Sequence, residues 1–162
     1  MIERKYLAHY IDGAFSAAAP EYIRLGKDLE EYSIELNPDV ESKQNILGES
    51  SVVVNGYEAS SSVEPYYYEY DDSLSEKIMD IAMNRTTGDG CKTTVVDVLL
   101  QPGAGDTAPT SVWAYREDCL VVPDSVGGDT SGVQIPFTIH RAGNRVKGTF
   151  DISSKKFTPS AQ

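Results

Sequence analysis

The chain has 162 residues, enough for one domain that buries about two thirds of its unfolded surface. It carries 25 acidic and 14 basic residues, and this net charge of −11 argues against a protein that grips nucleic acid through phosphate contacts. No apolar run approaches the roughly 18 residues of a membrane helix, and the first residues lack the pattern of a secretory signal, so we expect a soluble protein made in a cytoplasm.

The charge is unevenly distributed along the chain. Residues 1–80 hold 17 acids and 6 bases, whereas residues 81–162 hold 8 of each. Within the neutral half, residues 141–156 carry five bases and one acid. Opposite charge on two parts of one chain favours contacts between copies of the protein.

The first 65 residues combine short strand patterns with long polar stretches. Residues 1–20 are weakly patterned, and we interpret them as an arm that docks on its own domain or on a neighbour. Residues 22–25 and the alternating residues 29–36 predict strands. Residues 40–65 form a long excursion in which 51–57 predict a strand and Asn55-Gly56 a tight turn. An excursion of this length is unusual in a compact domain unless it has a function.

Residues 73–86 are the one segment with a helical pattern. Ser73 and Glu76 have the spacing of a capping box, in which each side chain accepts a backbone N–H of the first turn. Four apolar residues recur at helical spacing and predict one face packed on a sheet. These helix–sheet core residues are Leu74, Ile78, Ile81 and Ala82.

The patterns of the remaining segments mostly predict strands. Residues 64–70 place alternate tyrosines on one face, and the β-branched residues 93–100 are typical of a strand covered on both faces. Residues 133–140 and 145–152 predict a hairpin, and 158–162 a short polar tail. We therefore predict a mainly β domain spanning residues 1–162. It is a β-sandwich or small barrel with one flanking helix and a long extended loop at about 40–65.

No arrangement of residues predicts an enzyme. A nucleophile, a base and an orienting group do not stand out, and no cofactor or metal site is expected. Cys91 and Cys119 lack metal-ligand spacing and predict buried thiols. The strongest candidate for a binding function is the tyrosine run, whose rings could stack on a sugar. One reading is therefore a monomeric carbohydrate- or protein-binding β-sandwich that uses Tyr66, Tyr67, Tyr68 and Tyr70.

A second reading comes from a resemblance that extends over residues 22–157. The order of several short segments is similar to that of the tail tube, or major tail, proteins of bacteriophages that infect Gram-positive bacteria. These segments are Arg24-Leu-Gly-Lys-Asp-Leu-Glu-Glu, Ile34-Glu-Leu-Asn-Pro-Asp-Val, Asn45-Ile-Leu-Gly-Glu, Asp72-Ser-Leu-Ser-Glu-Lys-Ile, Cys91-Lys-Thr-Thr-Val-Val-Asp-Val and Gly127-Gly-Asp-Thr-Ser-Gly-Val-Gln-Ile-Pro-Phe.

The resemblance implies a structural subunit that assembles into hexameric rings. The rings would stack into a hollow virion tail tube, assembled in the cytoplasm of the bacterial host, through which DNA passes without specific binding. It also implies other tail proteins as partners: a tape measure, a tail terminator, a distal tail or baseplate protein, and a sheath if the tail is contractile. Residues 40–65 would then reach an adjacent ring. With the basic segment, this suggests inter-subunit contacts at Glu41, Lys43, Asn45, Glu49, Arg141, Arg145 and Lys147.

Overall fold

The computed structural model describes residues 1–102 and 110–160. One large antiparallel sheet dominates the fold. Its strands are β1 (Leu7–Asp12), β2 (Tyr22–Arg24), β3 (Ile34–Glu35), β6 (Ser60–Val63), β7 (Lys92–Gln101), β8 (Thr110–Pro123), β11 (Phe137–Asp151) and β12 (Lys156–Pro159). They run in the order β2-β1-β7-β8-β11-β6-β3, and β12 also pairs with β11. The prediction of a mainly β fold with a single α-helix is confirmed for the described residues.

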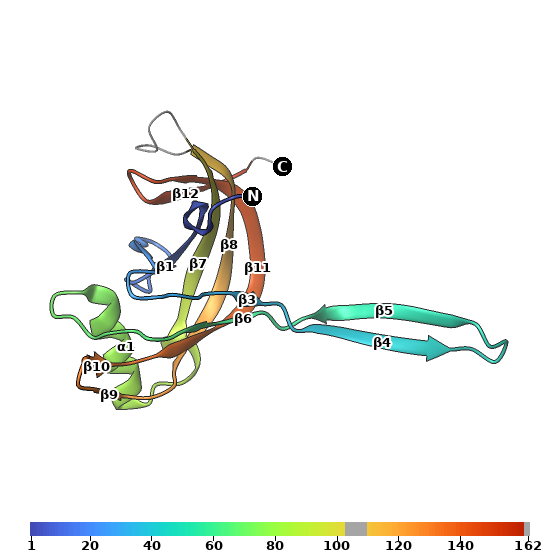
Figure 1. Cartoon of the computed structure of the whole chain (residues 1–162), viewed down its shortest axis with the longest axis horizontal. Helices are drawn as coiled ribbons and strands as arrows, with labels where there is room; N and C mark the ends of the chain where they lie inside the picture. Colours follow the sequence, from blue (N-terminus) through green and yellow to red (C-terminus); the bar gives the residue numbers. More distant parts are fainter. Residues whose placement is uncertain (103–109, 161–162) are drawn as a thin grey trace.

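Two hairpins lie outside this sheet: β4 (Pro38–Gln44) with β5 (Ser50–Tyr57), and β9 (Gly127–Asp129) with β10 (Gly132–Gln134). The β4–β5 hairpin projects away from the body, on the side opposite the single α-helix, α1 (Ser73–Asn84) (Figure 1). At about 3.3 Å per residue, the paired part of the hairpin is roughly 23 Å long. In the described part of the chain no helix is long and apolar enough to cross a membrane.

Two hydrophobic cores pack on the two faces of the main sheet. Val95 belongs to the first core with Leu74 and Ile78 of α1, whereas Val96 belongs to the second with Phe150. Successive side chains of a strand point to opposite faces, so β7 feeds both cores. This explains its almost continuous apolar run and confirms the prediction of a strand covered on both faces.

The helix begins at Ser73 as the sequence predicts, ends at Asn84 rather than at 86, and has its N-cap one residue before the predicted one. Leu74, Ile78 and Ile81 are buried, and Ala82 is half-buried beside them. The N-cap is Asp72, whose carboxylate accepts the N–H of Leu74 at 3.3 Å. The predicted capping box on Ser73 is therefore wrong. The negative charge of a carboxylate at the N-cap also interacts favourably with the positive end of the helix dipole, whereas a neutral serine has no such charge.

Of the two alternatives for residues 1–20, association with the chain's own domain is what the structure shows, but as a strand of the main sheet and not as an arm. Residues Leu7–Asp12 form β1, which pairs with β2 on one side and with β7 on the other. The pattern is hard to recognise because two of its buried residues, His9 and Asp12, are polar. The Asp12 carboxylate accepts backbone N–H groups of the following turn, from Ala14, Ser16 and Glu21.

Three further strand predictions differ from the structure. Within residues 29–36 only Ile34–Glu35 are a strand, and residues 64–70 contribute a single bridge, between Tyr67 and Gln134. The predicted hairpin at 133–152 is one continuous strand from Phe137, β11. Its glycine-containing segment at 142–144 is an irregularity in the pairing with β8, since the register shifts on both sides of Gly143.

The polar tail predicted at 158–162 is ordered by pairing as far as Pro159. Thr158 and Pro159 belong to β12 and lie opposite Thr149 and Gly148 of β11. Residues 161–162 lie outside the described part of the chain.

Candidate interaction site

The excursion at 40–65 is a β-hairpin followed by β6, not an extended loop. Asn37 forms its base with a positive φ of 44°, and its side-chain amide donates to the backbone oxygen of Glu58 at 3.1 Å. Asn45 organises the tip, because its side-chain oxygen accepts the N–H groups of Leu47 and Glu49, each at 3.0 Å. The turn therefore lies at the tip, and the turn predicted at Asn55-Gly56 is wrong, since both residues belong to β5.

The two faces of the hairpin differ in chemistry. In the register of β4 and β5, Val40 pairs with Val54, Ser42 with Val52 and Gln44 with Ser50. Directly opposite residues of an antiparallel pair share a face, so these six residues form a face without any charge. We call Val40, Ser42, Gln44, Ser50, Val52 and Val54 the uncharged face.

The opposite face carries the charges. Here Glu41 pairs with Val53 and Lys43 with Ser51, and the side chain of Asn55 donates to Glu41 at 3.4 Å. A hairpin that is surrounded by water is expected to carry polar or charged side chains on both of its faces. The asymmetry indicates that only one side of the hairpin is suited to permanent contact with water.

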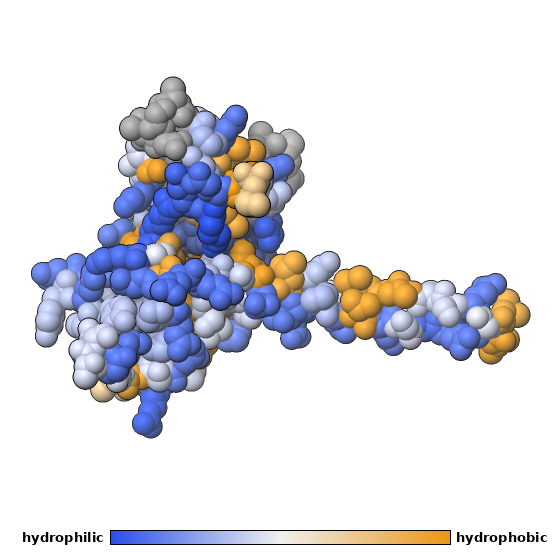
Figure 2. Space-filling view, in the orientation of Figure 1, coloured by the Kyte–Doolittle hydropathy of each residue, from blue (hydrophilic) through white to orange (hydrophobic). Residues whose placement is uncertain are grey.

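The uncharged face and the tip expose large apolar side chains. Val52 is 68% exposed, and Ile46 and Leu47 at the tip are also strongly exposed. Figure 2 shows these hydrophobic residues as patches along the hairpin and at its end. A two-stranded hairpin is at best marginally stable in water without a further layer. Its exposed apolar face has the chemistry of an interaction surface.

The structure brings together four of the seven predicted contact residues and separates the others. Glu41, Lys43, Asn45 and Glu49 are exposed on the hairpin, although Asn45 also has the structural role at the tip. The remaining three lie on β11, far from the hairpin in sequence, where Arg145 and Lys147 are exposed. Arg141 is buried, so its guanidinium is not available for a contact between copies, and that prediction is wrong.

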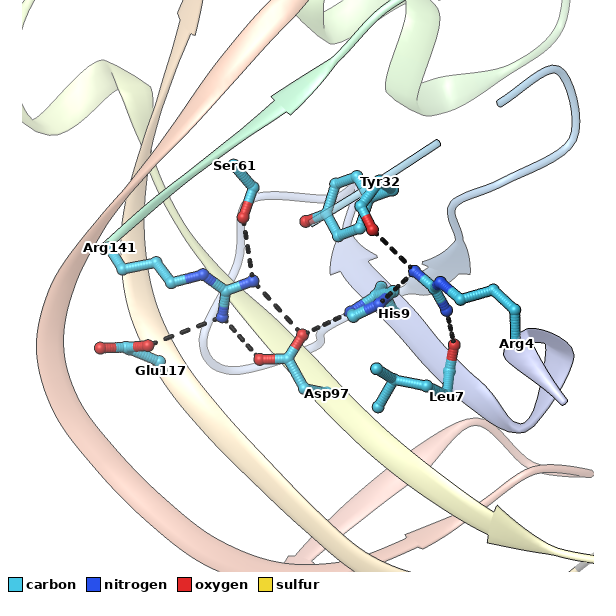
Figure 3. Close-up of polar contacts among 8 residues, drawn as sticks. All are labelled: Arg4, Leu7, His9, Tyr32, Ser61, Asp97, Glu117 and Arg141. Carbon is cyan, nitrogen blue, oxygen red and sulfur yellow. Dashed lines mark hydrogen bonds and ion pairs between the residues drawn. The ribbon is translucent and has the colours of Figure 1, made fainter. Parts of the chain in front are cut away.

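Arg141 instead forms a buried ion pair with Asp97 (Figure 3). Its Nη1 donates to one carboxylate oxygen at 2.6 Å and its Nη2 to the other at 3.3 Å. Nη1 also lies 3.6 Å from a carboxylate oxygen of Glu117, and Nη2 donates to the Ser61 hydroxyl at 3.4 Å. This contact provides a partner for the hydroxyl of Ser61, a buried polar residue of β6.

His9 extends the network toward the N-terminus. Its Nε2 lies 3.0 Å from Nη2 of Arg4, which also donates to the backbone oxygen of Tyr32. A guanidinium has no acceptor, so Nε2 accepts and Nδ1 carries the hydrogen, which it donates to Asp97 at 2.7 Å. Together these contacts join β1, β7, β8, β11 and β6.

The charges inside this network stabilise one another. Burial opposes the ionised carboxylate, but the hydrogen bond from His9 and the charge of Arg141 hold the pKa of Asp97 below its usual value. Burial also opposes the guanidinium, yet the Asp97 carboxylate raises the pKa of Arg141. With the acid and the base both charged and hydrogen-bonded, the network is suited to holding strands together.

Sequence reasoning missed this network. The available signal was Asp97 itself, a single acid inside the apolar run of β7, because a buried carboxylate needs a cation or several donors. Its partner could not be identified, since Arg141 is 44 residues away in the chain and His9 is 88.

Two ring contacts in the tyrosine run are edge-on. Tyr66 is packed edge-on against Phe137 with ring centroids 5.1 Å apart, and its hydroxyl donates to Asp72. Burial raises the pKa of this hydroxyl. Tyr68 and Tyr70 are also edge-on to each other, at 5.7 Å. A ring that stacks on a sugar needs an exposed face, whereas the ring of Tyr66 packs against the first hydrophobic core.

Among the described residues, no group of three or more His, Cys, Asp or Glu side chains is placed to hold a metal ion. Cys91 and Cys119 are free and buried, as predicted. Comparison with known proteins adds no assignment: neither a scan against known protein families nor a search of curated proteins finds a match to this chain.

Proposed function

We propose that this chain is the structural subunit of a bacteriophage tail tube, which self-assembles into stacked hexameric rings. The observation that supports the proposal most directly is the projecting β4–β5 hairpin with its uncharged face. A monomeric binding module would leave Val40, Val52 and Val54 in water, whereas an assembling subunit buries them on a neighbour.

The exposed valines of the hairpin add a physical argument to the resemblance. Burying a valine side chain contributes about 1.5–3 kcal/mol relative to leaving it exposed. Three valines on one face, repeated in every subunit of a ring, amount to a substantial driving force for association. Contacts between different surfaces of identical copies close into rings or extend as filaments, and a tube uses both.

The charge of the chain suits a channel that conducts DNA. Each lysine or arginine that faced the lumen could exchange counterions for a phosphate contact and retain the duplex. A net charge of −11 lets a subunit present a neutral or acidic wall. DNA would then pass without specific binding, and the other partners would be tail proteins at the two ends of the tube and a sheath if the tail contracts.

The test compares substitutions on the two faces of the hairpin. Purified wild-type protein, concentrated and examined by light scattering and negative-stain microscopy, is expected to form rings or tubes. Val52→Glu places a charge on the uncharged face and is expected to abolish them. Ser51→Glu places the same charge on the opposite face, across from Lys43, and serves as the matched control.

Both variants should unfold at the wild-type denaturant concentration, because neither residue touches a core. A wild-type protein that stays monomeric across concentration, salt and pH would refute the proposal. So would a Val52→Glu variant that assembles as readily as Ser51→Glu.

A further inference from the structure

Asn55 is the only asparagine of the chain that is followed by a glycine. The backbone nitrogen of the residue after an asparagine can attack the side-chain amide, and this intramolecular reaction contributes to the thermal lability of asparagine. A following glycine presents that nitrogen without a Cβ and with the widest choice of backbone angles. The dipeptide Asn55-Gly56 therefore has a chemical reactivity that the other asparagines of the chain do not share.

The structure places Asn55 at an irregularity of the β4–β5 hairpin. Val54 lies opposite Val40 and Gly56 opposite Asp39, so Asn55 is the extra residue of β5 that the register with β4 skips. A residue of this kind interrupts the ladder of hydrogen bonds and bends the strand. The side chain of Asn55 is exposed, and its hydrogen bond to the Glu41 carboxylate is long, at 3.4 Å. The backbone and the side chain are thus both held weakly at this point.

The hairpin around Asn55 offers little protection against the reaction. A rigid, extended strand would keep the side-chain carbonyl away from the following nitrogen, because the attack needs the two atoms in contact. The hairpin, however, has only two strands, and all of its paired residues except Gly56 are exposed. Such a segment opens locally at a small cost in free energy. Each opening gives the chain the freedom to bring the two reacting atoms together.

The other four asparagines are held more firmly or lack the nucleophile. Asn37 is followed by Pro38, whose nitrogen has no hydrogen to lose. The amide of Asn45 donates to a carboxylate at 2.9 Å, and its oxygen accepts two backbone N–H groups. The amides of Asn84 and Asn144 donate to carboxylates at 2.7 and 2.9 Å. These residues provide an internal comparison for Asn55.

We infer that Asn55 is a site of spontaneous deamidation. The backbone nitrogen of Gly56 loses its proton to hydroxide and forms a bond to Cγ of Asn55. The bond from Cγ to the amide nitrogen breaks, and ammonia leaves with a proton taken from water. The resulting cyclic succinimide adds one water, which opens it at either of its two carbonyl carbons. The products are aspartate and isoaspartate, and in total one water enters and one ammonia leaves.

Either product changes the hairpin. Aspartate places a carboxylate beside that of Glu41, where the wild-type amide donates a hydrogen bond, and like charges on neighbouring strands destabilise their pairing. Isoaspartate adds a methylene group to the backbone of β5 and disturbs the pairing of Gly56 with Asp39. The reaction therefore loosens the hairpin as the protein ages. This inference goes beyond the proposed function and does not rest on it, because the reaction needs only one copy of the chain.

The test follows the amides of all five asparagines by mass spectrometry. Purified protein is incubated at a mildly alkaline pH and digested, and each deamidated peptide is heavier by the difference between a hydroxyl and an amino group. Isoaspartate is distinguished from aspartate by its separate elution and by methylation with an isoaspartyl methyltransferase. Asn55 is expected to lose its amide at least about tenfold faster than Asn45, Asn84 or Asn144.

Gly56→Ala tests whether the glycine is what makes the site reactive. In the described part of the chain a Cβ at position 56 meets no atom within 4 Å, and φ of Gly56 is not in the left-handed region, so the fold should tolerate the change. The added Cβ restricts the approach of the nitrogen and is expected to slow deamidation of Asn55 at least about tenfold. Gly127→Ala also adds a Cβ in open space, but after a valine, and as the matched control should leave the rate unchanged.

The consequence for the hairpin is measured with Asn55→Asp, which has the sequence of one product. Amide hydrogen exchange in β4 and β5 is expected to be faster in this variant than in wild type. Asn84→Asp makes the same change at the end of α1 and should leave exchange in the hairpin unchanged. Exchange in Asn55→Asp that is as slow as in wild type would overturn the inferred loosening.

Three results would overturn the deamidation site itself. The first is an Asn55 that keeps its amide as long as Asn45 does, and the second is a Gly56→Ala variant that reacts at the wild-type rate. The third comes from comparison with the denatured chain, in which no hairpin protects the amide. A folded-state rate more than about tenfold below the denatured rate would show that the hairpin holds Asn55 firmly. None of these results depends on assembly, so the inference and the proposed function are tested separately.

Discussion

Replacing Arg141 by methionine tests whether the buried network holds the sheet together. The guanidinium is 1% exposed and its partner Asp97 is 3% exposed, so water cannot take the place of the lost cation. Methionine keeps the apolar stem but leaves a buried carboxylate without its base. Breaking a buried ion pair in this way costs about 3–5 kcal/mol in the free energy of unfolding.

The assay is urea denaturation with an unchanged m-value, which shows that the difference lies in stability. Arg145→Met on the same strand is the matched control, because this side chain is exposed and its contact with the ring of Tyr115 is a cation–π contact, worth about 0.5–1 kcal/mol. Adding Asp97→Asn to Arg141→Met removes the stranded charge and should recover part of the loss. A loss below about 1 kcal/mol for Arg141→Met, or no recovery in the double variant, would refute the reasoning.

The same pair predicts a dependence on pH. The folded-state pKa of Asp97 is below its unfolded value of about 3.9, so near that pH the unfolded state binds more protons. The wild-type stability from this group is therefore complete above about pH 5 and is lost as the pH falls through the lowered folded pKa. In Arg141→Met the buried carboxylate no longer has its cation and takes up a proton more readily. The stability difference between the two proteins should accordingly shrink as the pH falls.

Three further predictions concern the helix and the thiols. Ile78→Ala removes a fully buried side chain from the contact between α1 and the sheet, and should cost about 2–5 kcal/mol in urea denaturation. Asp72→Ala should cost about 1 kcal/mol through loss of the cap, whereas Ser73→Ala should change stability by less than about half of that, and the reverse order would show that the cap is misassigned. Burial raises the pKa of Cys119 to about 12, so at pH 8 it should react with a thiol reagent only after denaturation; rapid labelling of the folded protein would contradict this.

Some elements were predictable because their signals are local. The apolar residues of α1 recur with the helical period, and the β-branched run of β7 identifies a strand that is covered on both faces. The short strand patterns at residues 22–25 and 51–57 likewise identified β2 and most of β5. In each case the information lies within about a dozen neighbouring residues, which is the range over which periodicity acts.

The errors of boundary and pairing share a different cause. At 142–144 the residues of a tight turn are present, but hydrogen bonds from β8 carry the strand through them. In β1 the polar residues His9 and Asp12 are buried because distant or turn groups satisfy them. The structure of such segments is determined by contacts with residues far away in the chain, and local propensity cannot predict those contacts.

The candidate interaction site divides in the same way. From the sequence alone, residues 40–65 could be identified as an excursion in need of a function, and the hairpin acids and the basic segment as opposite charges. Only the tertiary structure decided that valines 40, 52 and 54 share one uncharged face, because that depends on the register of β4 with β5. Only the tertiary structure shows that Arg141 is buried, because its guanidinium pairs with Asp97 across the sheet. It also shows that Arg145 and Lys147 are exposed beside Tyr115. The alternation of side chains can be read from the strand itself. Which of its two faces is exposed to water depends on its register and on the elements that pack against it.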